Sequence, residues 1–176
     1  MSSNTLSDSQ QAIIAHCAQH EILHPRRTEF VCVVFEGRFI KYGNHGSLYP
    51  QYETHQYISR FADGDPSAPR VPKVYDYFTP DRITAYLVME YIELKPSPAQ
   101  DAPQRVAKAL QWLRDLPAPP SVTIGPLGGG RARHPLFKDF EARLSFSSID
   151  AVERYMNKVR PCLSQAFAPR YLLTVT

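Results

Sequence analysis

RFIKYG at positions 38–43, together with FVCVVF at positions 30–35 just before it, gives the clearest indication of the fold. Both runs are rich in the β-branched and aromatic residues that favour strands. Gly37 lies between them, and glycine supplies the positive φ that a tight hairpin turn needs. The pattern therefore predicts two antiparallel strands. Because side chains alternate along a strand, Ile40 and Lys41 should lie on opposite faces of the sheet.

The sequence after this hairpin predicts one helix and two further strands. Residues 47–61 form the helix, which carries Glu53, and the prolines within 63–72 prevent it from continuing. Strands are expected over residues 74–78 and 84–89. The helix side chains expected to face the sheet are Leu48, Tyr52, Ile58 and Phe61.

A short helix is expected in front of the sheet, over residues 9–20, where Ser7 or Ser9 can cap the first turn. An antiparallel sheet with a helix inserted between its strands is an α+β arrangement. A proline-rich stretch begins soon after Ile92, so we expect a first domain over residues 1–94.

The remaining residues, 95–176, are expected to form a smaller helical domain. Apolar side chains at helical spacing predict one helix over 103–116 and another over 149–160. The expected boundary signals are Asp101 as the cap of the first helix, Ser147 with Asp150 as the capping box of the second, and Pro161 as its end.

Lys41 and Glu53 form the pair that could carry chemistry. A nucleoside triphosphate needs a fixed cation on its phosphates, and a lysine is held best by a carboxylate from a helix packed on the sheet. Leaving one charge of a fully buried pair alone would cost about 3–5 kcal/mol. The plain alternative for Lys41 is a surface lysine near the edge of a strand.

The order of these segments resembles the N-terminal lobe of the aminoglycoside phosphotransferase family, which has a protein-kinase-like fold. The likeness is strongest to the fungal kinase-like branch of that family and covers residues 21–163. The segments that carry it are IKYG at 40–43, Glu53, VPKVY at 71–75, YLVMEYI at 86–92 and IGPLGGG at 124–130.

The resemblance implies a nucleotide site with ATP as the cofactor. Lys41 would contact the phosphates, and Glu53 would orient Lys41. Backbone groups from Glu90 to Ile92 would bind the adenine, and Met89, with the preceding Val88, would border its pocket. The plain alternative for Met89 is core packing where two lobes join.

Two departures from the family bear on activity. No glycine precedes Gly37, so residues 24–29 cannot wrap phosphates as a glycine-rich loop does. The sequence also has neither a His-Gly-Asp catalytic loop nor an Asp-Trp-Glu type metal motif, so Mg²⁺ and phosphotransferase activity are not expected in this chain. We expect a kinase-like chain truncated before its catalytic loop. The alternatives are a regulatory pseudokinase and a fragment of an active small-molecule phosphotransferase.

Composition limits the compartment and the partners. The net charge of +3 is spread over 20 basic and 17 acidic side chains, which gives no strong field for nucleic acid or anionic lipid. No apolar run is long enough to span a membrane. Three widely spaced cysteines match neither a disulfide framework nor a zinc site, so we expect a cytoplasmic protein. Apolar surface left uncovered in the helical domain should favour self-association.

Overall fold

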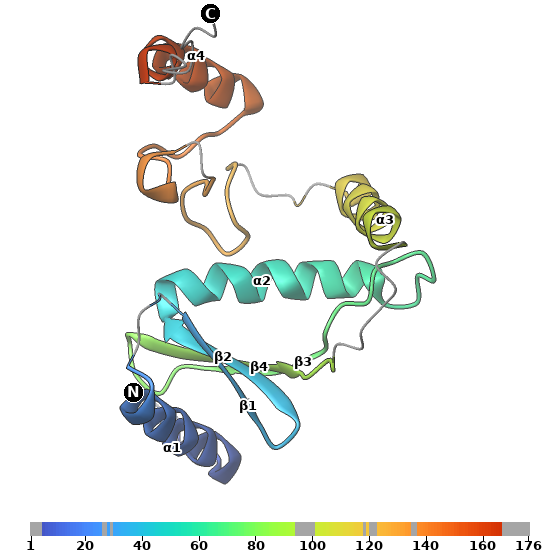
Figure 1. Cartoon of the computed structure of the whole chain (residues 1–176), viewed down its shortest axis with the longest axis vertical. Coiled ribbons are helices and arrows are strands. Elements are labelled where there is room, and N and C mark those ends of the chain that lie inside the picture. Colours follow the sequence, from blue (N-terminus) through green and yellow to red (C-terminus); the bar gives the residue numbers. More distant parts are fainter. Residues whose placement is uncertain are drawn as a thin grey trace, which may run out of the picture. The chain divides into compact units, whose positions relative to one another are not determined.

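The chain is an α+β protein with a four-stranded antiparallel sheet, as the sequence predicts (Figure 1). The computed structural model describes residues 5–25, 28, 30–93, 101–117, 119, 123–134 and 137–166. They fall into two compact units, residues 1–119 and residues 120–176. The division therefore follows the third helix, whereas the sequence places a boundary near Leu94. Among the described residues, every helix is too short or too polar to pass through a lipid bilayer.

The sheet has the strand order β1-β2-β4-β3, so the two central strands are β2 and β4. Strand β2 pairs antiparallel with both β1 and β4. In this register Lys41 lies opposite Cys32 of β1 and Leu87 of β4. The strands are β1 (Phe30–Phe35), β2 (Arg38–Asn44), β3 (Val74–Phe78) and β4 (Thr84–Glu90). A lysine thus lies on a central strand with a neighbour on each side.

The turn between β1 and β2 uses two residues with positive φ. Glu36 has φ 49° and Gly37 has φ 70°. A two-residue hairpin loop of this kind matches the right-handed twist of its strands only when both central residues adopt positive φ. The glycine that sequence reasoning relied on therefore has the conformation expected of it.

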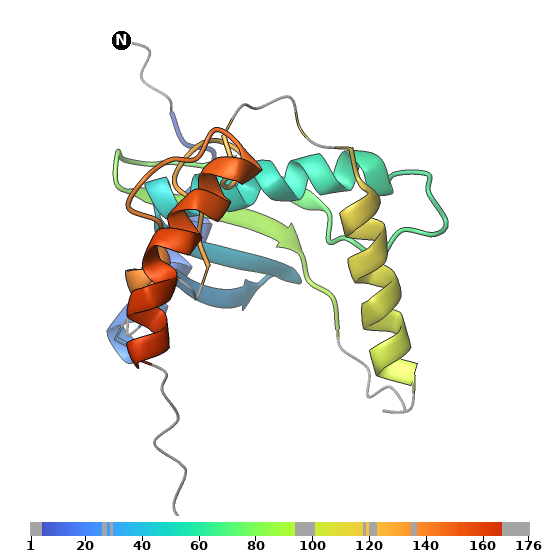
Figure 2. The same cartoon turned by 90° about the horizontal axis from the view of Figure 1, so that it is seen from above.

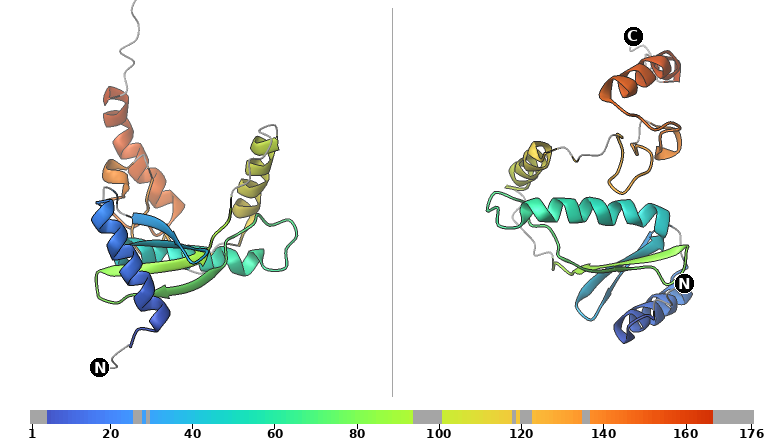
Figure 3. Two further views of the ribbon diagram at one scale, coloured as in Figure 1. Left: turned by 60° about the horizontal axis from the view of Figure 1, so that its bottom comes forward. Right: turned by 180° about the vertical axis from the view of Figure 1, so that it is seen from behind.

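Helix α1 (Asp8–Leu23) covers one face of the sheet. Ser7 caps this helix. The Ser7 hydroxyl accepts a hydrogen bond from the Gln10 backbone N–H, and the Gln10 side-chain oxygen accepts one from the Ser7 backbone N–H. Figure 3 shows α1 and the next helix on opposite sides of the sheet. The buried cluster beneath α1 consists of Ile13, Cys17, Val33, Ile40, Tyr42, Phe78, Tyr86 and Val88.

Helix α2 (His45–Ala62) covers the other face. It starts at Asn44, whose side chain accepts from the Gly46 amide, and it includes Pro50. Its buried anchor is Leu48, which packs with Ala85, Leu87 and Met89 of β4. Phe61, expected to face the sheet, is instead 39% exposed because the helix has run past the end of the strands.

Helix α3 (Ala102–Asp115) lies beside the C-terminal end of α2 (Figure 2). The indole of Trp112 donates to the Asp65 carboxylate at 2.8 Å, and this bond ties α3 to the segment after α2. Asp101 precedes the helix but makes no side-chain cap bond, contrary to expectation. The apolar stripe of α3 is exposed at Val106, Leu110 and Leu113.

The second unit has little sheet and one long helix. Bridges join Ile124 to Phe146 and Arg133 to Glu141, and a short helix η2 (Lys138–Phe140) lies between them. Helix α4 (Ile149–Ala166) begins where the Ser148 hydroxyl accepts from the Ala151 amide, so Ser148 rather than Ser147 is the cap. The helix continues through Pro161, because proline removes one backbone bond without excluding helical φ.

Candidate functional site

Lys41 is held by helix α2. Its ammonium donates to Gln51 Oε1 at 2.5 Å and lies 4.4 Å from the ring centroid of Phe30. The Gln51 amide is itself fixed, because its Nε2 donates to the Ser47 carbonyl one turn earlier at 3.1 Å. The side chain of Lys41 therefore has a defined position on the α2 face of the sheet, above an aromatic ring.

The structure gives Glu53 a different partner from the one expected. The Glu53 carboxylate accepts a hydrogen bond from the Tyr49 hydroxyl. This bond, and then the negative charge of Glu53, raise the pKa of Tyr49. Residues 51 and 53 lie about 200° apart around a helix, so Glu53 is on the opposite side of α2 from Gln51. Among the described ion pairs and hydrogen bonds, no Lys41–Glu53 pair occurs, and Gln51 is the residue that orients Lys41.

Orientation by an amide differs from orientation by a carboxylate in one important way. An amide oxygen accepts a hydrogen bond without cancelling the charge of the donor. An ammonium has three N–H donors, and the Gln51 bond uses one of those of Lys41. The site thus presents a positioned cation whose charge remains available to an anion.

Met89 and Val88, which should border one pocket, lie on different faces of β4. Met89 is 9% exposed and packs with Leu48 on the α2 face, the same face as Lys41. Val88 is fully buried beneath α1 with Ile40. The alternation of side chains along a strand requires this separation.

Glu90, at the end of β4, is already engaged on both its side chain and its backbone. Its carboxylate accepts from the Arg70 guanidinium at 2.6 Å and from the Lys73 amide at 3.2 Å, and these bonds lower its pKa. Its own amide donates to the Lys73 carbonyl at 2.8 Å. Ile92 follows β4 outside the sheet and is half-buried.

A cluster of tyrosines beside the site was not anticipated from the sequence. Tyr52 stacks on Tyr77 with ring centroids 4.4 Å apart, and Tyr49 lies 6.0 Å from Tyr77. His45 Nδ1 and the Tyr77 hydroxyl are 2.9 Å apart. Burial raises the pKa of Tyr77 to about 12. The signal was present, since Tyr49 and Tyr52 are three apart on a helix that packs on the strand of Tyr77.

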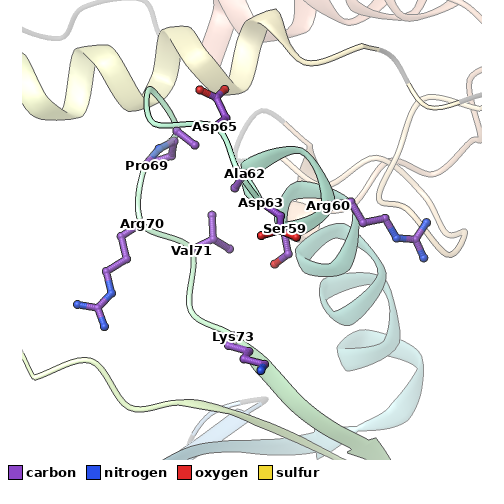
Figure 4. A pocket seen from close by; sticks show the side chains of 10 residues that line it. Ser59, Arg60, Ala62, Asp63, Asp65, Pro69, Arg70, Val71 and Lys73 are labelled. Carbon is purple, nitrogen blue, oxygen red and sulfur yellow. The ribbon is translucent and has the colours of Figure 1, made fainter.

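Cavities occur among the described residues. One of about 460 Å³ is lined by residues before β1, including His24 and Thr28, and by the first residues of β1, including Phe30. The ring of Phe30 is also the one that Lys41 covers, although Lys41 itself is not part of this lining. Another, of about 670 Å³, lies at the C-terminal end of α2 (Figure 4). Neither lining contains Lys41, Glu53, Met89, Glu90 or Ile92.

Comparison with protein-family models, curated proteins and solved structures finds no match to this chain. Within the part of the chain that the structure describes, no group of three or more His, Cys, Asp or Glu side chains is arranged to hold a metal ion. What the molecule can bind has to be inferred from its own side chains. The positioned ammonium of Lys41 is the feature with the clearest chemical consequence.

Proposed function

We propose that the first unit binds the phosphates of a nucleotide, with ATP as the ligand, in the manner of a kinase-like N-terminal lobe. The observation that carries this proposal is the Lys41 ammonium, fixed at 2.5 Å from Gln51 of the helix that packs on its sheet. A lysine held in position on a strand of the sheet is one way in which kinases bind the phosphates of a nucleotide. The neutral amide of Gln51 keeps its charge available to a polyanion.

Two further features support the same proposal. Helix α2 follows β2 and returns over the face that carries Lys41, which is the arrangement of elements expected for such a lobe. A cavity of about 460 Å³ is lined in part by Phe30, the residue whose ring Lys41 covers, and by residues that precede β1. Backbone groups from Glu90 to Ile92 would contact the adenine.

We propose binding without phosphoryl transfer for the 176-residue chain, because its sequence contains no His-Gly-Asp loop and no Asp-Trp-Glu motif. Losing a general base alone typically slows a reaction by about 10²–10⁴-fold, and losing the metal ligands removes charge neutralisation as well. Widely spaced cysteines support the cytoplasm as the compartment. The exposed stripe of α3 supports some self-association.

The test is a titration of the purified chain with ATP by isothermal calorimetry, with and without Mg²⁺. We expect Lys41→Met to weaken binding by about tenfold or more, since hydrogen bonds to charged groups are worth about 1.5–3 kcal/mol. Lys108→Met, on exposed α3, is the matched control and should bind as the parent does. Equal thermal midpoints of the three proteins without ligand would show that all are folded.

Three results would contradict the proposal. No heat of binding at millimolar ATP would remove nucleotide recognition. Measured phosphoryl transfer that Lys41→Met abolishes would instead show that the chain is an active enzyme. An equal loss of affinity in Lys41→Met and Lys108→Met would show that the binding is a general effect of positive charge.

A further inference from the structure

The two edge strands of the sheet differ in how they are protected against further pairing. Among the described residues, β1 and β3 each pair with a single neighbouring strand. On β3, the register shifts between Val74 and Asp76, and the Asp76 carboxylate accepts a hydrogen bond from Gln10 at 2.9 Å. An irregular register and a charged side chain discourage another strand from pairing at an edge. The edge of β3 is therefore poorly suited to a further strand.

Strand β1 lacks this protection along its whole length. Its six residues, FVCVVF, include neither a proline nor a charged side chain, and its register with β2 is continuous. Soluble proteins usually place a charge, a proline or a bulge on such an edge. The side chain of Val34 is 47% exposed, so the accessible part of this strand is apolar. The edge of β1 is therefore suited to pairing with another strand.

The hairpin turn determines which backbone groups of β1 point away from β2. In a two-residue hairpin loop, the flanking residues, here Phe35 and Arg38, form a hydrogen-bonded pair. Hydrogen-bonded and non-hydrogen-bonded pairs alternate along an antiparallel ladder, so Val33 also bonds to β2. The N–H and C=O groups of Cys32 and Val34 are then directed to the free edge.

The start of β1 limits the part of this edge that can pair. The Thr28 hydroxyl donates to the Phe30 carbonyl at 2.5 Å, so this carbonyl already has a partner. The hydrogen bonds of the described residues give the edge-directed groups of Cys32 and Val34 no partner. The unpaired groups are thus arranged symmetrically on either side of Val33.

We propose that two copies of this chain pair antiparallel through β1, about a two-fold axis at Val33. Cys32 of each copy would lie opposite Val34 of the other, and each of these two pairs would exchange two N–H···O=C hydrogen bonds. An isologous contact of this kind satisfies the unpaired groups of both copies at once. The two four-stranded sheets would become one continuous sheet. The proposal does not rest on nucleotide binding.

Apolar surface beside the edge supports a second copy as the occupant. Leu23, at the end of α1, is 67% exposed and lines the cavity of about 460 Å³ together with Cys32. Because Cys32 lies opposite Val34 of the second copy in this register, that valine would lie beside the cavity. Covering exposed valine and leucine side chains adds a hydrophobic contribution to the backbone hydrogen bonds. Each copy supplies both the valine and the cavity, as a two-fold contact requires.

Sedimentation velocity of the whole chain over a range of concentrations tests the pairing. We expect a reversible dimer with a dissociation constant on the order of 100 µM, because an edge contact is smaller than the standard interface of about 1,200–2,000 Å². Val34→Lys should weaken this dimer at least about tenfold, since a lysine on an edge strand opposes pairing. Leu110→Lys, on the exposed stripe of α3, is the matched control and should leave it unchanged. Matching circular dichroism spectra would show that all three proteins are folded.

Oxidative cross-linking tests the register. All proteins in this assay carry Cys162→Ala, so the remaining native thiols are Cys32 and the fully buried Cys17. In Val34→Cys, the new thiol should lie opposite Cys32 of the second copy at a Cα separation of about 5.5 Å, which suits a disulfide. We therefore expect Val34→Cys to form covalent dimers on non-reducing gels.

Two proteins serve as controls for this cross-linking. The parent, and Val34→Cys combined with Cys32→Ala, should form few covalent dimers. In each of them, the accessible thiols of the two copies are diagonal neighbours about 7–8 Å apart, which is too far for a disulfide without backbone movement. The difference between Val34→Cys and these controls is specific to the register centred on Val33.

The proposal is overturned by any of the following outcomes. A chain that stays monomeric up to about 1 mM would leave the edge of β1 unpaired or to a different protein. A dimer that Val34→Lys does not weaken, or that Leu110→Lys weakens equally, would not be held by β1. Equal cross-linking of the parent and Val34→Cys would place Cys32 opposite itself and exclude the two-fold axis at Val33.

Discussion

The two faces of the sheet differ in what they bury. Beneath α1, the side chains of Ile40, Tyr42 and Val88 form a closed cluster with Ile13 and Cys17 of the helix. Beneath α2, the buried cluster is smaller, and it is bordered by the ammonium of Lys41 and by a group of tyrosines. Because side chains alternate along β2, its neighbouring residues Ile40 and Lys41 lie on these two different faces.

The two faces of one sheet are therefore expected to differ in what their side chains contribute. Within the buried cluster of the α1 face, the side-chain polar groups are hydroxyls and a thiol, so these side chains act mainly by packing. The α2 face keeps a positioned charge with a neutral partner, an arrangement that adds little to stability. Substitutions on the first face should therefore change the free energy of unfolding, and substitutions on the second should change binding.

The largest expected effect comes from Ile40→Ala on the α1 face. Ile40 is fully buried, and truncating such a side chain to alanine costs about 2–5 kcal/mol of unfolding free energy. Lys41→Met, one residue along the same strand, should cost less than about 1 kcal/mol. Urea unfolding followed by circular dichroism measures both. Similar losses in the two variants would show that the faces are not divided in this way.

A second effect concerns alkaline pH. Burial first, and the charge of Glu21 second, raise the pKa of the Cys17 thiol from 9.0 to about 12. The unfolded chain loses this proton near pH 9 while the folded chain keeps it, so stability is full below pH 9 and falls as pH rises toward 12. The expected slope is about 1.4 kcal/mol per pH unit for one proton.

Cys17→Ala removes that titration, so its unfolding free energy should fall less steeply with pH. In Cys17→Ala, the unfolding free energy should still fall above pH 10, because the folded chain also raises the pKa of Tyr77, to about 12. Cys32→Ala is the control, because Cys32 is exposed and lies on the other face. If Cys32→Ala flattened the pH profile as much as Cys17→Ala, the assignment to the α1 face would be incorrect.

The smallest effect on stability is expected from Gln51→Glu. The new carboxylate would pair with Lys41 but lose the amide's bond to the Ser47 carbonyl, so unfolding free energy should change by less than about 0.5 kcal/mol. ATP binding should nevertheless weaken by about threefold at low salt, since the lysine charge becomes neutralised. Calorimetry against Gln56→Glu on the same helix tests this. Tighter ATP binding in Gln51→Glu would contradict the role given to the amide.

The sheet could be predicted from the sequence because its signals are local. Runs of β-branched and aromatic residues, broken by Gly37 and by prolines, mark all the strands to within two residues of their ends. The helices were found by their apolar spacing, and their boundaries were less certain. Helix α4, for example, continues past Pro161, since the sequence shows where a bond is lost but not whether packing tolerates the loss.

The site was harder to predict because it depends on the angle at which α2 meets the sheet. A carboxylate was expected opposite Lys41, and Glu53 is the only acid in the helix expected over residues 47–61. Leu48, Gln51 and Tyr52, spaced by three and four residues, form the side of the helix that faces the sheet. A strict use of this spacing would have predicted Gln51 as the partner of Lys41, because Glu53 does not lie on this side of the helix.

Trp112 has a practical consequence for future measurements. It is the protein's single tryptophan, and its indole N–H is bonded to Asp65, a residue of the wall of the cavity at the end of α2. Indole emission shifts in wavelength when its hydrogen bond or its solvent contact changes. The molecule thus carries one intrinsic chromophore at the junction of α3 and that cavity, and its fluorescence can follow events there without any added label.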